Sequence, residues 1–80
     1  MKTNTIALSH AQPGCIACIH SISDLDSLVC RRLLDLGITV GSEIRMKRKS
    51  LFGGPLTLES NGQLFGIRKQ EAAKIEVQIR

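Results

Sequence analysis

Only one stretch of this sequence has the apolar spacing of an amphipathic helix, and this restricts the fold more than any other feature. The apolar residues that recur at this spacing are Leu25, Leu28, Val29, Leu33 and Leu36. Ser and Asp side chains that can cap a helix precede the stretch, and Gly37 follows it, where a left-handed C-terminal residue is expected. The pattern predicts a helix over residues 25–36 with the apolar stripe buried.

The rest of the chain consists of short segments in which apolar and polar residues alternate, as they do in half-buried strands. Asn61 and Gly62 lie between two such segments and predict a two-residue hairpin. Residues 69–73 can form one helical turn. Because closure removes exposed strand edges, about five strands round a small core suggest a β-barrel. We expect one mainly β domain over residues 1–80, with its helix between the first long strand and the next.

Composition limits the cellular setting and the partners. The chain has 80 residues and a net charge of +4, which permits a basic interaction surface. Its longest purely apolar run, Cys15 to Ile19, is far shorter than the roughly 20 residues of a spanning helix. No charged-then-apolar leader opens the sequence, and its three cysteines are an odd number. We therefore expect reduced thiols in the cytosol and no membrane span.

The sequence favours a binding role over catalysis or nucleic acid recognition. Phe52 and Phe65 are the only aromatic residues, too few to stack the bases of a single strand. A Gly-rich phosphate loop is missing from the sequence, and no serine, histidine and acid are spaced to suggest a triad. We expect no enzyme, no cofactor and no nucleic acid partner. Nucleic acid binding through a basic strand is the third-ranked alternative.

Cys15 and Cys18, three positions apart, are the candidate metal ligands together with His20. A tetrahedral zinc site needs four ligands, and neither His10 nor Cys30 has a zinc-like spacing to this pair. In a straight strand, residues three apart point to opposite faces, so the two sulfurs diverge. We favour small apolar packing residues over a metal site, with metal binding as the alternative.

Four of the eleven basic residues fall within residues 45–49, which alternate as a strand. With Ile44 and Met46 in the core, Arg45, Lys47 and Lys49 should face solvent along one strip. The next segment places two large apolar residues in a loop with two glycines and a proline. We predict a partner-binding surface from the strip and this loop, namely Leu51, Phe52, Gly53, Gly54 and Pro55. The alternatives are a solvated strand face and a loop that plugs the barrel end.

These segments also resemble a known family. Residues 32–44, RLLDLGITVGSEI, are similar to the signature of the ferrous iron transport protein A (FeoA) family. Three further segments fit in order: Gly14, Ala17 and Ile19 in the first long strand, FGGP at residues 52–55, and RKQEAAKIEV at residues 68–77. The resemblance covers about residues 5–80, but Cys15 and Cys18 are not part of it.

The resemblance implies an SH3-like β-barrel and a small cytosolic accessory protein of bacterial ferrous iron uptake. The partner that it implies is the ferrous iron permease FeoB, which has a cytosolic GTPase domain and a membrane domain. The chain would then reach the inner face of the membrane only through that partner. Similar domains end metal-dependent repressors, so the alternative is a transition-metal-binding or metal-sensing domain. This chain has no helix-turn-helix before its predicted barrel.

Overall fold

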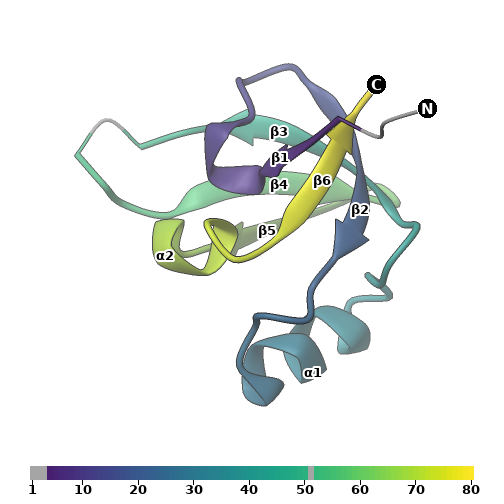
Figure 1. Ribbon diagram of the computed structural model, residues 1–80. Coiled ribbons are helices and arrows are strands. Elements are labelled where there is room, and N and C mark those ends of the chain that lie inside the picture. Colours follow the sequence, from purple (N-terminus) through teal and green to yellow (C-terminus); the bar gives the residue numbers. More distant parts are fainter. Residues whose placement is uncertain (1–3, 51) are drawn as a thin grey trace.

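Six antiparallel strands form one sheet in the order β1-β6-β2-β3-β4-β5 (Figure 1). The structure is a computed structural model and describes residues 4–50 and 52–80. The strands are β1 (Thr5–Ala7), β2 (Ile16–Ser21), β3 (Glu43–Arg48), β4 (Leu56–Ser60), β5 (Gln63–Ile67) and β6 (Glu76–Ile79). The mainly β fold is confirmed, with one strand more than the five expected, because Thr5–Ala7 pairs with β6.

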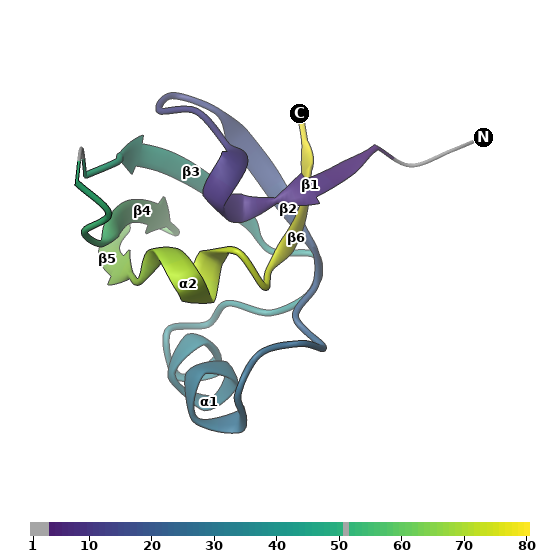
Figure 2. The same ribbon diagram turned by 60° about the vertical axis from the view of Figure 1, so that its left-hand side comes forward.

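Three helical segments connect the strands. The 3-10 turn η1 (Leu8–His10) follows β1, the main helix α1 (Ser27–Asp35) lies between β2 and β3, and the single turn α2 (Lys69–Ala72) precedes β6. Figures 1 and 2 both show α1 below the strands, while η1 and α2 lie next to each other. None of the helices described is long and apolar enough to cross a membrane.

Local signals define both ends of α1. The carboxylate of Asp26 accepts a hydrogen bond from the Leu28 N–H at 2.8 Å and caps the first turn. At the other end, Gly37 has φ +80°, its N–H donates to the Leu34 carbonyl, and the Ile38 N–H donates to the Leu33 carbonyl. This pair of bonds is a Schellman motif, and it confirms the prediction that the helix ends at a left-handed Gly37.

The apolar stripe predicted for this helix is wrong at Leu28, whose side chain is 78% exposed. Leu33 is buried, whereas Leu25 is buried in the turn that precedes the helix. Five residues of helix rotate a side chain by about 140°, so Leu28 and Leu33 cannot both face the core. The packing of Leu33 against the sheet sets the orientation of α1, and Leu28 then faces solvent.

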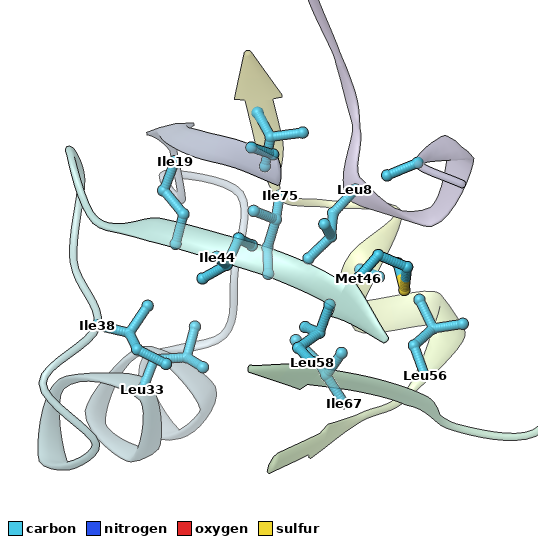
Figure 3. Packing of buried hydrophobic residues seen from close by; sticks show 14 of the residues in the cluster. Leu8, Ile19, Leu33, Ile38, Ile44, Met46, Leu56, Leu58, Ile67 and Ile75 are labelled. Atoms are coloured by element: carbon cyan, nitrogen blue, oxygen red, sulfur yellow. The ribbon is translucent and has the colours of Figure 1, made fainter. Parts of the chain in front are cut away.

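The core lies inside the curve of the sheet and is covered at its open side by α1 and its flanking turns (Figure 3). Its side chains come from every strand except β1 and from all three helical segments or their ends. They are Leu8, Ala11, Ala17, Ile19, Leu25, Leu33, Ile38, Ile44, Met46, Leu56, Leu58, Ile67, Ala72, Ile75 and Val77.

The sheet is not closed, which corrects the expectation of a continuous barrel. Within residues 4–50 and 52–80, β1 and β5 are the two edges, and each pairs with one neighbour. Strand β1 is three residues long within the described residues and ends at Ala7, because the chain turns into η1 at Leu8. The strands therefore curve round the core as in an SH3-like fold without a hydrogen-bonded seam.

Replacement of Gly37 tests the cap of α1. We expect Gly37→Ala to destabilise the domain by about 1–2 kcal/mol, because a Cβ is disfavoured at positive φ. Nothing lies within 4 Å of the added Cβ, so the cost comes from the backbone alone. Gly37→Asn should cost less, since asparagine tolerates this conformation better. Urea unfolding of the three proteins measures the order, and equal stability of all three would contradict the cap.

Candidate partner-binding surface

Strand β3 presents its charged residues to solvent as its alternation predicts. Ile44 and Met46 are buried, while Arg45 and Lys47 are exposed. Arg45 lies opposite Glu59 of β4, and Met46 lies opposite Leu58, so each pair shares one face of the sheet. The first half of the predicted strip is therefore present on the outer face.

A bulge ends the alternation before Lys49. The register shifts between Met46 and Arg48, so that Arg48 lies opposite Thr57 and the two residues take the outer face. Lys49 is half-buried, and its Nζ donates to the Ser9 carbonyl at 2.9 Å. The prediction that Lys49 continues the strip is wrong, because the extra residue of the bulge reverses the sides that follow it. The outer basic row consists of Arg45, Lys47 and Arg48.

Two ion pairs lie on or near this basic row. Lys47 Nζ lies 3.8 Å from a Glu59 carboxylate oxygen, and Arg80 Nε lies 3.3 Å from a Glu43 carboxylate oxygen. All four side chains are at least a third exposed, so these ion pairs contribute little to stability. Among the described residues, Lys47 is the member of the row that pairs with a carboxylate, and Arg48, next to the β3–β4 loop, forms no ion pair.

A hydrogen bond joins the two ends of the β3–β4 loop. The Ser50 hydroxyl donates to the Pro55 carbonyl at 2.8 Å. Gly53 has φ +76°, and a Cβ at Gly54 would lie 2.9 Å from the Ser50 Oγ. Gly53 therefore takes a backbone angle that favours glycine, and a side chain at Gly54 would require the Ser50 side chain to shift.

Phe52 at the tip of this loop is 96% exposed. The alternative in which it plugs the end of the barrel is therefore wrong. Leu51, the other apolar residue predicted for this surface, lies outside the described residues. An exposed phenylalanine beside a row of positive charges is the combination of residues found where an aromatic anchor is surrounded by a charged rim.

The candidate metal ligands come from different parts of β2 and its approach. Cys15 lies in the turn before the strand, where its carbonyl accepts from the Met46 N–H, and Cys18 lies within the strand opposite Glu43. His20 is exposed at a shift in the pairing of β2 with β6. In the part of the chain that the structure describes, no three His, Cys, Asp or Glu side chains are grouped to hold a metal ion.

The sequence does not predict that Arg48 lies in the outer basic row or that a set of polar residues meets near Ser9. Arg48 joins the outer row only because of the bulge, for which the sequence has no local signal. Ser9, His10, Lys49 and Lys69 line one polar cavity although they come from three separate segments. Neither their spacing nor their neighbours in the sequence indicate that they meet.

Six antiparallel strands curved round one core, with a capped helix between the second and third, define this chain as a small SH3-like β domain. The model of the FeoA domain matches residues 6–79, and the chain belongs to this family. It is therefore a small protein associated with ferrous iron transport, as its resemblance implied.

Solved structures agree with this assignment. A FeoA protein from Chlorobium tepidum is 34% identical, with 92% of this chain and 70% of that chain covered, and a TM-score of 0.85. A FeoA-like protein from Clostridium acetobutylicum is 30% identical over 99% of this chain and 90% of that one, with a TM-score of 0.79.

A similar fold occurs inside a larger regulator. A manganese-dependent transcriptional repressor is 20% identical, and all of this chain covers 44% of it with a TM-score of 0.87. At this identity the likeness shows the fold alone. A comparison with curated proteins gave no match.

Proposed function

We propose that this chain is a cytoplasmic accessory of bacterial ferrous iron uptake that acts by binding the permease FeoB. In this proposal the chain works by contact and not by catalysis, and it meets the membrane only through its partner. The family supports the setting in iron transport. The observation on which the binding role depends is the exposure of the Phe52 side chain, which is 96% accessible next to the basic row.

Covering the exposed Phe52 ring would be favourable for a partner. An aromatic ring buries a large apolar area in an interface, and such residues supply most of the binding energy there. The bond between Ser50 and Pro55 holds the two ends of the loop together on either side of Phe52. The positive end of the basic row at Arg48 would favour an acidic partner surface and speed its approach.

We expect Phe52→Ala to weaken binding to the isolated cytosolic domain of FeoB by more than about 1 kcal/mol, or about fivefold. The free energy of unfolding should be unchanged, because the exposed Phe52 ring does not pack in the core. Calorimetric titration with and without GTP measures the affinity, and it also shows whether the nucleotide state of the partner matters.

Leu28→Ala is the matched control for this experiment. Leu28 is 78% exposed and lies on α1, away from the β3–β4 loop in both views (Figures 1 and 2). The Leu28→Ala substitution removes an exposed apolar side chain, as Phe52→Ala does, but leaves the proposed surface unchanged. Equal affinities of the wild type and Phe52→Ala, or equal losses in both variants, would contradict the proposed surface.

A further inference from the structure

A polar cavity of about 450 Å³ lies between η1, the end of β3 and the start of α2. Figures 1 and 2 show these helical segments next to each other, on the side of the molecule from which the β3–β4 loop extends. Ser9, His10 and Gln12 line the cavity from the η1 segment, and Lys49 and Ser50 line it from the end of β3. Lys69 of α2 completes the polar wall, over the buried Leu56.

The bulge in β3 places the Lys49 ammonium at this cavity. Its Nζ donates to the Ser9 carbonyl at 2.9 Å, across forty residues of sequence. An ammonium has three N–H donors, so this bond leaves two for other acceptors. The lysine is half-buried, and the bond to Ser9 limits its movement, so its position does not depend on a ligand.

The Ser9 hydroxyl adds a neutral donor to the cavity. Ser9 is only 7% exposed and lines this space, and no side-chain oxygen or nitrogen that is shut off from solvent lacks a partner within residues 4–50 and 52–80. Ser60, the other buried polar residue of the core, donates to the Glu43 carbonyl at 3.0 Å. A hydroxyl rotates to suit its acceptor, so that of Ser9 can donate to a molecule inside the cavity.

We propose that this cavity binds a phosphate dianion, free or as the phosphate group of a small molecule. Lys49 and Lys69 supply two positive charges, and the described lining includes no carboxylate. Donors surround the space from three segments, which suits a tetrahedral anion. A planar carboxylate is best matched by the guanidinium fork of arginine, and no arginine is among these residues. The site does not depend on binding of FeoB.

Titration of the full chain with inorganic phosphate and with glycerol 3-phosphate tests this site at constant ionic strength. We expect saturable shifts of the backbone amide signals of η1 and α2 in two-dimensional NMR spectra. Tighter binding of glycerol 3-phosphate would show that the site takes a phosphate monoester, and tighter binding of phosphate that it takes the free ion. Acetate should bind more weakly than either. No saturable shift, or acetate binding as tight as phosphate, would overturn the proposal.

Lys49→Gln should weaken phosphate binding by about tenfold, because it removes a charge-assisted hydrogen bond. Lys47→Gln is the matched control, since it removes the same charge from the outer face of the same strand. Equal losses in these two variants would show general charge attraction and overturn the site. If Lys49→Gln does not fold, Lys69→Gln makes the same comparison and leaves the bond between Lys49 and Ser9 in place.

Ser9→Ala tests the hydroxyl separately from charge. The variant should be as stable as the wild type, because it keeps the Ser9 carbonyl that accepts from Lys49 and leaves no charge without its bond. Its affinity for phosphate should fall several-fold at the same net charge. An unchanged affinity would show that the Ser9 hydroxyl does not meet the anion, which contradicts the arrangement proposed here.

Discussion

Leu33→Ala should destabilise the domain by about 2–5 kcal/mol, a large share of the stability of a domain this small. Leu33 is 2% exposed and holds the helix against the sheet, next to Ile38 (Figure 3). The space that it shares with Phe65, Ile67 and other core residues contains a void of only about 10 Å³. Removal of three carbon atoms there leaves a cavity that neighbours from several strands and the helix cap cannot close.

The matched control is again Leu28→Ala, five residues earlier on the same helix. Because Leu28 is 78% exposed, its removal should change stability by less than about 0.5 kcal/mol. Equilibrium unfolding in urea measures both variants. Losses of similar size would mean that α1 faces the sheet through a different side than the structure shows.

Val77→Asp should prevent the domain from folding, which is the largest effect we expect from a single change. Val77 is fully buried in β6, the strand that joins β1 to β2 at one side of the sheet. It lies opposite Ile6 of β1 and Ile19 of β2. A carboxylate at this position has no partner in the apolar core, and burial of an unpaired charge costs more than such a domain can lose.

Gln78→Asp adds the same charge one residue later and tests the face of the strand. Gln78 is exposed and lies opposite Cys18 and Thr5. Successive residues of a strand point to opposite faces, so this variant should fold with little loss of stability. Circular dichroism and thermal unfolding distinguish the two outcomes, and a folded Val77→Asp protein would show that the register of β6 is wrong.

Local interactions are the part of this protein that its sequence determines. Gly37 ends the helix because the Schellman motif needs a residue at positive φ next to the last turn. Asn61 and Gly62 take φ +53° and φ +80° in the predicted hairpin, since both residue types tolerate this conformation. The alternation of Ile44 and Met46 sets the buried face of β3. In each case the physical cause acts within a few residues, so the pattern predicts it.

Tertiary structure decided which of these elements face one another and where the functional groups gather. Leu28 fits the helical pattern, but the packing of Leu33 against the sheet turns it to solvent. The bulge in β3 depends on the pairing with β4. It places Arg48 on the outer face and lets the Lys49 ammonium donate to the Ser9 carbonyl. Contacts across many residues compete with local preference and are invisible in any single segment. Both the open sheet and the cavity at Ser9 follow from such contacts, so neither could be predicted from the sequence alone.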